Sequence, residues 1–203
     1  MYKKSLIERM LLKLYYIFTA SYFRLLHGIK VGKGCRIHFS STIRGNIEIK
    51  NNVNIGKNVN ISGNVKIGEK SNIADYARLN TMPDGKIDIG KDAHINIYNI
   101  IGSSHSVKIG EHALFAAGVK ITDATHRIEN IDDIIKQAAI DSEELVVGDN
   151  CWLGFDVNVI MGGAIGKNCV IGSKSLVNKK IPSNSIAVGI PAKVIKKRDF
   201  IEK

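Results

Sequence analysis

The sequence predicts an all-β fold, a parallel β-helix of about seven triangular coils with a helical segment before it and a long loop after Ile121. The first observation is a six-residue spacing of large aliphatic residues, which in the segment 145–178 falls at Val147, Leu153, Val159, Ile165, Ile171 and Val177. The second is a glycine directly after four of them, at Gly148, Gly154, Gly166 and Gly172. Six is neither a helical period nor the alternation of an amphipathic strand. It is typical of a repeat in which each hexad forms a short strand and a turn, and three hexads form one coil.

Composition and charge narrow the class of protein. The chain has 203 residues, enough for one domain with a substantial core, and its 44% hydrophobic content is ordinary for a globular protein. The net charge of +10 is high and is concentrated before and after the repeat. A basic chain can bind nucleic acid, a membrane surface or an anionic small molecule. No aromatic-basic RNA motif or helix-turn-helix signal is present, so we expect no nucleic-acid partner.

The three cysteines, Cys35, Cys151 and Cys169, each take the small inward position of a hexad. We therefore expect buried thiols in a protein of a reducing compartment, which places it in the cytoplasm. Cys151 and Cys169 are 18 residues apart, so they should stack in neighbouring coils.

Residues 1–28 differ from the rest of the chain, since they contain no hexads and are rich in Leu, Tyr and Phe. We expect a helical cap. Arg9 and Lys13 interrupt the apolar run, which argues against a spanning segment, and Lys13 also argues against a signal peptide. Two interpretations remain. The helix covers the edge strands at the open end of the β-helix, which we favour, or residues 1–27 rest as a basic amphipathic helix on the inner face of the membrane.

The expected β-helix covers residues 29–181. The six-residue spacing begins at Val31 and is interrupted after Leu79, after Ile101 and after Ile121. Each interruption falls at the third hexad of a coil, so all three loops should leave from one corner of the prism. Residues 182–203 are expected to close the prism and to continue as a basic tail.

The loop at 122–145 is too long to be a simple connector. It is acidic and contains Asp123 and His126. A long loop on a rigid scaffold is where binding and catalytic residues are expected. We therefore expect this loop to contact a substrate, with Asp123 among the contact residues.

Beyond the spacing itself, three segments carry a resemblance: THRI in the long loop, VVGDNCWLG after it and GIPAKVIKK near the end. With the hexads, they resemble the hexapeptide-repeat acyltransferases, in particular the galactoside and maltose acetyltransferases and the O-acetyltransferases of bacterial surface polysaccharide synthesis. The resemblance covers Val31 to about Lys197. It implies a left-handed coil, acetyl-CoA as co-substrate, a sugar or surface-polysaccharide precursor as acceptor, and a homotrimer.

The chemistry implied is transfer of an acetyl group to a hydroxyl, which is a poor nucleophile at neutral pH and needs a base. Histidine suits that role because its pKa lies near neutrality. His126, in the sequence ATH, matches the catalytic histidine of the family, and Asn96 matches a pocket asparagine that holds the acceptor. Ser104 stands where the galactoside enzymes carry a carboxylate, so a galactoside acceptor is not implied.

The resemblance also implies a coenzyme site. Its residues lie in the last coils and in the closing segment: Trp152, Gly154, Ser173, Asn178, Lys179 and Lys193. Ammonium groups of this kind neutralise phosphate charge. Phe155 replaces a small polar residue of the galactoside enzymes, so the path of the pantetheine should differ there.

Two other functions remain open from the sequence, and a third is disfavoured. The same base could serve an N-acetyltransferase acting on an amino sugar. The repeat could also be a non-catalytic scaffold, which acetyl-CoA binding would exclude. Zinc catalysis of the gamma-class carbonic anhydrase type needs three converging histidines. His94 and His112 are 18 residues apart, but the two-residue shift after Ile101 takes them out of one column, so we expect no metal to be required for catalysis.

Overall fold

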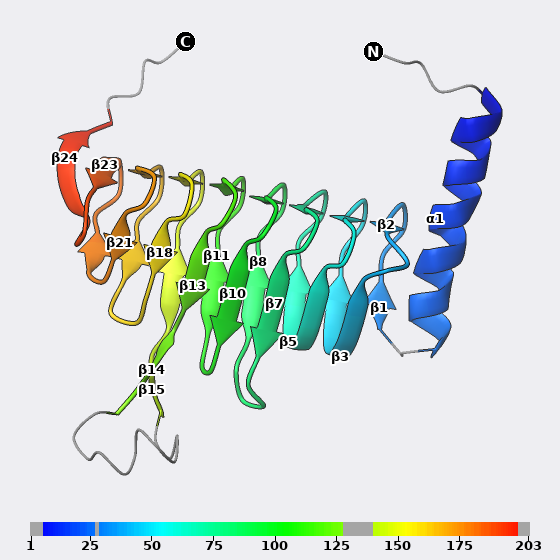
Figure 1. Ribbon diagram of the computed structural model, residues 1–203, viewed down its shortest axis with the longest axis horizontal. Helices are drawn as coiled ribbons and strands as arrows, with labels where there is room; N and C mark the ends of the chain where they lie inside the picture. The colour runs from blue at the N-terminus through cyan, green and yellow to red at the C-terminus, as the bar shows by residue number, and fades with distance from the viewer. Residues whose placement is uncertain (1–5, 27–28, 128–139, 199–203) are drawn as a thin grey trace.

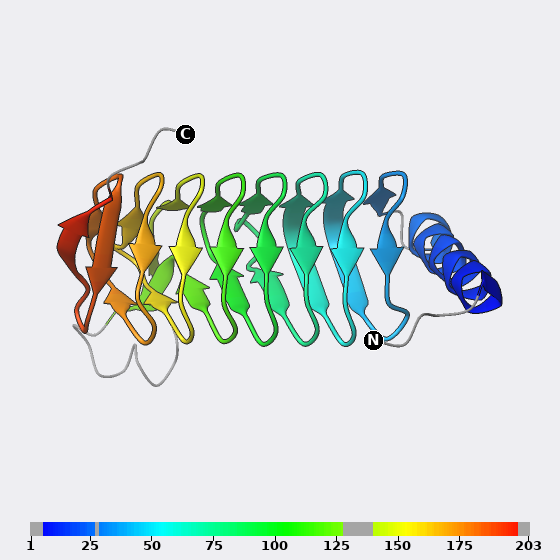
Figure 2. The ribbon, with the colours of Figure 1, turned by 90° about the horizontal axis from the view of Figure 1, so that it is seen from above.

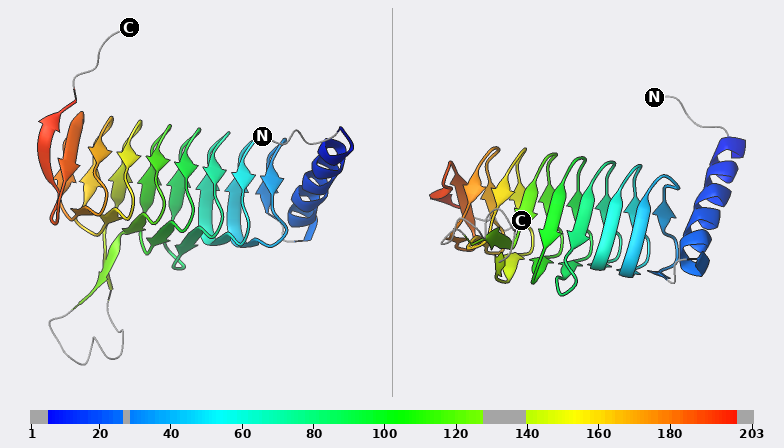
Figure 3. Two further views of the ribbon diagram at one scale, coloured as in Figure 1. Left: turned by 45° about the horizontal axis from the view of Figure 1, so that its top comes forward. Right: turned by 60° about the horizontal axis from the view of Figure 1, so that its bottom comes forward.

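The computed structural model describes residues 6–26, 29–127 and 140–198 of the chain. Within these residues one helix, α1 (Leu6–Leu26), lies at one end of a long parallel β-helix (Figure 1). The coils follow one another along the rod in chain order, and a two-stranded ribbon projects from one edge near the C-terminal end (Figure 3). The predicted all-β fold with an N-terminal helix is confirmed.

Each complete coil contributes one strand to each of three stacked columns. The first column contains β1 (Lys30–Val31), the second halves of β3 (Thr42–Ile49) and β5 (Asn60–Ile67), β8 (Ile87–Ile89), β11 (Val107–Ile109), β16 (Leu145–Val147), β19 (Ala164–Ile165) and β22 (Lys180–Ile181). The second contains β2 (Arg36–Ile37), β4 (Asn54–Ile55), β6 (Asn72–Ile73), β9 (His94–Ile95), β12 (Leu114–Phe115), β17 (Trp152–Leu153), β20 (Val170–Ile171) and β23 (Ser185–Val188). The third contains the first halves of β3 and β5, then β7 (Arg78–Thr81), β10 (Ile100–Ser103), β13 (Lys120–Thr122), β18 (Asn158–Val159) and β21 (Leu176–Val177).

The register follows the hexads. Ile37 pairs with Ile55, and Ile55 with Ile73, in parallel strands of successive coils. The residues of the six-residue spacing from Ile37 to Val177 are each no more than 3% exposed and form a continuous core. The spacing therefore marks the inward side chains, as predicted.

The β-helix continues beyond the last predicted hexad. Strands β22 and β23 pair in parallel with β19 and β20, and Ile181 and Ala187 add to the core. Ile181 follows Val177 at a spacing of four residues instead of six, so the six-residue pattern ends one turn before the solenoid does. The solenoid thus has about eight turns, the last of them incomplete. Strand β24 (Lys193–Lys197) then pairs antiparallel with β23 and closes this end.

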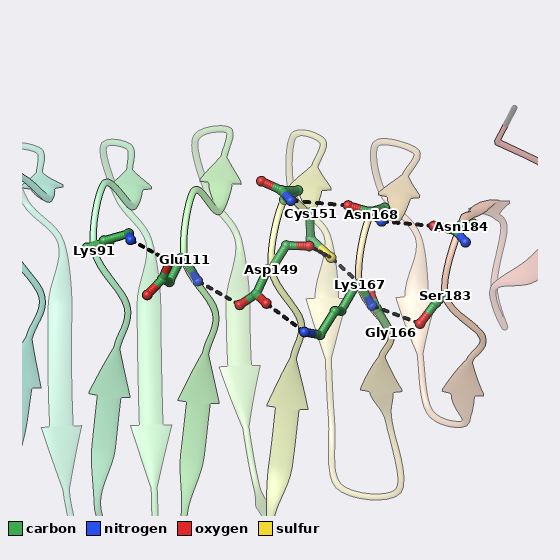
Figure 4. Close-up of polar contacts among 10 residues, drawn as sticks. Lys91, Glu111, Asp149, Cys151, Gly166, Lys167, Asn168, Ser183 and Asn184 are labelled. Atoms are coloured by element: carbon green, nitrogen blue, oxygen red, sulfur yellow. Dashed lines mark hydrogen bonds and ion pairs between the residues drawn. The ribbon is translucent and has the colours of Figure 1, made fainter. Parts of the chain in front are cut away.

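The corner between the first and second columns is held by side chains that bond from coil to coil (Figure 4). Asn168 accepts a hydrogen bond from Asn150 at 3.2 Å and donates one to Asn184 at 2.9 Å. Nearby, Asp149 pairs with Lys167 at 3.0 Å. That ammonium group, together with the backbone amide of the preceding coil, holds the pKa of Asp149 below its usual range. The corner is therefore a polar ladder outside an apolar core.

All three cysteines are buried and free. Cys151 lies beside Cys169 in the next coil, because the neighbouring Trp152 and Val170 are paired. The Cys151 thiol donates to the carbonyl of Gly166 at 3.0 Å, and burial raises its pKa to about 12. A thiol that stays protonated is a packing group rather than a nucleophile.

Helix α1 crosses the open end of the first coil (Figure 2). Ala20 and Phe23 are buried there, and Thr19 donates a hydrogen bond to the carbonyl of Ile37 at 2.7 Å. Arg24 donates to the carbonyl of Val31, also at 2.7 Å. The helix therefore covers the unpaired edge of the first coil, which would otherwise expose a template for strand pairing. Within the described residues, no helix combines the length and the apolar character needed to cross a bilayer.

Candidate active site at the loop corner

All three insertions leave from the corner between the third and first columns, which we call the loop corner (Figure 1). They connect β7 to β8, β10 to β11, and β13 to β16. The same corner also carries the short connections from β18 to β19 and from β21 to β22. The predicted single corner for the loops is confirmed, and it gathers segments that are far apart in sequence.

Asp123 organises this corner. It follows β13 and is fully buried. One carboxylate oxygen accepts from the amide of Ser104 at 2.7 Å. The other accepts from the Ser103 hydroxyl at 2.7 Å and from the amides of His105 at 2.9 Å and Ser106 at 2.7 Å. Charge-assisted bonds of this kind are the strong ones. The carboxylate is thus engaged within the protein, and it fixes the start of the long loop to the loop of the preceding coil.

The return of the long loop is fixed as well. Glu144 accepts from Lys108 at 2.6 Å and from the Ser106 hydroxyl at 3.3 Å. The lysine ammonium holds the pKa of the Glu144 carboxyl below its usual range. Both ends of the loop are therefore tied to the loop and strand that precede them in the solenoid.

Between these anchors the loop forms a ribbon of β14 (Ala124–His126) and β15 (Ile140–Ser142) that stands away from the prism (Figure 3). Arg127 and Asp141 form an ion pair across the ribbon at 2.8 Å. His126 ends β14 and is exposed. Residues 128–139 of the expected acceptor loop lie outside the described residues. The structure thus presents the predicted base on a projecting arm.

The predicted coenzyme residues of the last coils lie on the second column and at its following corner. The indole of Trp152 is half exposed on β17, beside the half-exposed Leu114 of β12. Ser173 accepts a hydrogen bond from the amide of Phe155 at 3.1 Å. A Cβ at Gly154 would lie 2.7 Å from the amide nitrogen of Ser173, so only glycine fits there. These residues form an apolar strip with a serine hydroxyl beside it.

Asn178 and Lys179 lie instead at the loop corner, between β21 and β22. A Cβ on Gly162 would be 3.1 Å from the carbonyl of Asn178 and 3.8 Å from a carboxylate oxygen of Glu143, at the base of the ribbon. Asn178 is therefore near the loop that carries the histidine. Lys193 is exposed on β24, opposite Val188.

Asn96 is not brought to His126 within one chain. It is exposed just after β9, and its side-chain oxygen accepts from the amide of Ile97 at 2.8 Å. This position belongs to the corner between the second and third columns, whereas His126 projects from the loop corner. A single chain therefore separates the predicted base from the predicted acceptor residue and from Trp152.

The sequence interpretation missed an exposed aromatic patch at the corner between the second and third columns. The rings of Tyr76 and Tyr98 stack at 5.2 Å with an interplanar angle of 15°. The exposed side chains of Ile97, Ile100 and Phe155 lie along the same corner. Both tyrosines have positive φ, 63° and 59°, a conformation that Asn adopts at position 58 of this corner. A tyrosine at a turn position of the repeat was the signal for this patch.

The histidines do not converge. His94 is paired with Leu114, and His112 occupies a turn beside Asp92, so the predicted loss of register between them is confirmed. In the part of the chain that the structure describes, no group of three or more His, Cys, Asp or Glu side chains is placed to hold a metal ion.

The fold and the loop corner define a class of protein, a parallel β-solenoid with a histidine on a projecting loop. No protein-family model matches the chain. It is 36% identical over 127 residues to WbbJ of Escherichia coli, a proposed lipopolysaccharide biosynthesis O-acetyl transferase, with 59% of this chain and 65% of that protein aligned. It is 34% identical over 110 residues to galactoside O-acetyltransferase of the same organism, covering 54% of this chain and 53% of the relative.

Among solved structures, AntD, an N-acyltransferase from Bacillus cereus, has the same fold, with a TM-score of 0.64 and 18% sequence identity over 84% of this chain and 83% of that one. The chain aligns with less than two thirds of the length of the two curated relatives. The two curated relatives confirm the resemblance to O-acetyltransferases that was drawn from the sequence, and AntD shows that the β-solenoid fold is shared.

Proposed function

We propose that this protein is an acyltransferase that moves an acetyl group from acetyl-CoA to a hydroxyl of a sugar or surface-polysaccharide precursor, with His126 as general base. The observation that carries the proposal is the position of His126, exposed on a β-ribbon whose two ends are anchored by Asp123 and Glu144. The names of the curated relatives support sugar O-acetylation. The three buried, free cysteines support the proposal that the protein acts in the cytoplasm.

In the proposed reaction, one imidazole nitrogen of His126 accepts the proton of the acceptor hydroxyl. At the same time, the hydroxyl oxygen attacks the thioester carbonyl carbon of acetyl-CoA. The carbon–sulfur bond then breaks, and the imidazolium returns the proton to the leaving coenzyme thiolate. The products are the acetyl ester and free coenzyme A, so the base is regenerated. General-base catalysis of this kind contributes about 10²–10⁴ in rate.

We place the coenzyme along Trp152, Gly154 and Ser173. The apolar strip of β17 offers the indole as a flat contact, and the Ser173 hydroxyl can reach the pantetheine amides. Lys179 and Lys193 are exposed cations toward the same end of the rod, suited to the coenzyme phosphates. Asn178 lies near the base of the ribbon of its own chain, because the Gly162 position is close to both Asn178 and Glu143, so we place it on the same side of the seam as His126.

We propose a homotrimer with its active sites at the seams between chains. One chain alone separates His126 from Asn96 and Trp152, and the projecting ribbon is shaped to reach a neighbour. The aromatic patch supplies an apolar contact of the kind that marks interfaces. Small-molecule sites commonly lie between packed units, and threefold symmetry would give three equivalent sites.

The test is a screen of sugar acceptors with acetyl-CoA that reads the release of free thiol, run on the wild type, His126→Asn and His112→Asn. His112 is exposed at a turn with positive φ, as is Asn150 at the same corner, so His112→Asn is a matched control. We expect His126→Asn to lower turnover by about 10² or more and His112→Asn to leave it unchanged. Full turnover by His126→Asn would refute the role of His126 as general base. Acetylation of amino sugars alone would favour N-acetylation. A protein that does not bind acetyl-CoA would be a non-catalytic scaffold.

A further inference from the structure

Helix α1 has two apolar faces, and only one of them is used in the fold. Thr19, Ala20 and Phe23 are buried against the first coil. The opposite face carries Ile7, Leu11, Leu14, Phe18 and Leu25, at spacings of three, four and seven residues that place them on one side of a helix. These five side chains are 60–80% exposed. We call this set the outward face of α1.

The outward face is accessible to a flat surface. The helix crosses the end of the rod, and its buried side is turned toward the first coil (Figure 2). The outward face therefore points away from the prism along the long axis. Met10 and Ile17 widen it on one flank and are also more than half exposed.

Cations border this apolar surface. A groove of about 530 Å³ lies where the helix meets the first coils, and its lining includes Leu12, Lys13, Ile17 and Arg36. Lys30 and Lys33 are exposed on the first coil, which the helix contacts. An apolar face bordered by cations is the pattern of a helix that lies in the interface of an anionic bilayer.

We propose that α1 binds the protein to an anionic lipid surface, with the outward face in the bilayer interface and Lys13 and Arg36 at the headgroup phosphates. A second copy of the chain is a weaker fit for this face. Coiled-coil partners are selected by charges that flank a narrow seam, whereas the apolar side chains of Met10 and Ile17 occupy one flank here. The proposal is independent of the acyl-transfer reaction, since it needs neither acceptor nor coenzyme.

The test is flotation of the full chain with vesicles of phosphatidylcholine alone or with 30 mol% phosphatidylglycerol added, at low and high salt. We expect the protein to float with the anionic vesicles and salt to weaken the binding, because the charge contribution is screened. Leu14→Glu/Phe18→Glu should abolish flotation, and Lys13→Gln should lower the partition coefficient about fivefold, the value expected for one cation near the surface.

Two matched controls separate this effect from general damage. Met82→Glu places a charge on another exposed apolar side chain, in the loop between β7 and β8, and Lys57→Gln removes an exposed cation elsewhere on the prism; both should float like the wild type. The circular dichroism and melting of Leu14→Glu/Phe18→Glu should match those of the wild type, since both side chains are exposed. Wild-type protein that fails to float, or that floats equally with neutral vesicles, would overturn the proposal. So would an assembly in lipid-free solution that Leu14→Glu/Phe18→Glu dissociates, because the second copy would then be the occupant.

Discussion

Replacing Asp123 by Asn tests whether this carboxylate is the anchor of the loop corner. The side chain accepts from one hydroxyl and three consecutive backbone amides, at distances between 2.7 and 2.9 Å. Asparagine of the same size keeps one acceptor oxygen, and its amide group must face at least one backbone N–H. A hydrogen bond to a charged group contributes about 1.5–3 kcal/mol, and a buried donor without an acceptor costs about 1–3 kcal/mol. We therefore expect local destabilisation of about 2–4 kcal/mol.

A local measurement suits this prediction, because the coils of a solenoid do not have to unfold as one unit. Amide hydrogen exchange in wild type and Asp123→Asn should be compared at Ser104, His105 and Ser106. A change of 2–4 kcal/mol corresponds to about 30-fold to 1000-fold faster exchange, while amides near Ile55 should exchange as before. Asp149→Asn is the control, since that carboxylate is partly exposed. Unchanged protection at all three amides would refute the anchoring role.

Three further predictions concern the solenoid. Ile73→Ala should lower the free energy of unfolding by about 2–5 kcal/mol in urea titrations, because Ile73 is fully buried, and a loss below 0.5 kcal/mol would contradict the register. Gly154→Ala should weaken acetyl-CoA binding measured by calorimetry, since its Cβ would press on the Ser173 amide at 2.7 Å; equal affinity would remove Gly154 from the proposed site. Cys151 should resist iodoacetamide at pH 8 in the folded protein and react after unfolding, because burial raises its pKa to about 12. Rapid labelling of the folded protein would contradict this prediction, since it would show that the thiol is accessible.

The repeat was predictable because it imposes one physical requirement at every sixth position. A side chain such as Ile55 must fill the prism interior, so the spacing gives the register, the columns and the corner from which the loops leave. The last turn was missed for a physical reason as well. The connection before Ile181 is shorter than a hexad, yet β22 still pairs with β19.

The candidate site was less accessible to sequence reasoning. The six-residue spacing does not predict the structure of an irregular insertion. The ribbon that carries His126 and the buried position of Asp123 are fixed by tertiary hydrogen bonds, which the sequence pattern does not contain. The distance in sequence between Asn96 and His126 also concealed that they leave from different corners. The two exposed tyrosines, Tyr76 and Tyr98, interrupt a turn pattern that could have marked the aromatic patch.

The central claim is that each active site combines His126 of one chain with coenzyme contacts of its neighbour. The most direct measurement is acetyl transfer by mixed trimers of His126→Asn and Trp152→Ala, each inactive alone, co-expressed in equal amounts. If the site lies at the seam, random assembly leaves both His126 and Trp152 intact at about a quarter of the seams. About a quarter of wild-type activity should therefore return. If each chain holds a complete site, no mixed trimer contains an intact one, and activity at the level of the single variants would contradict the account.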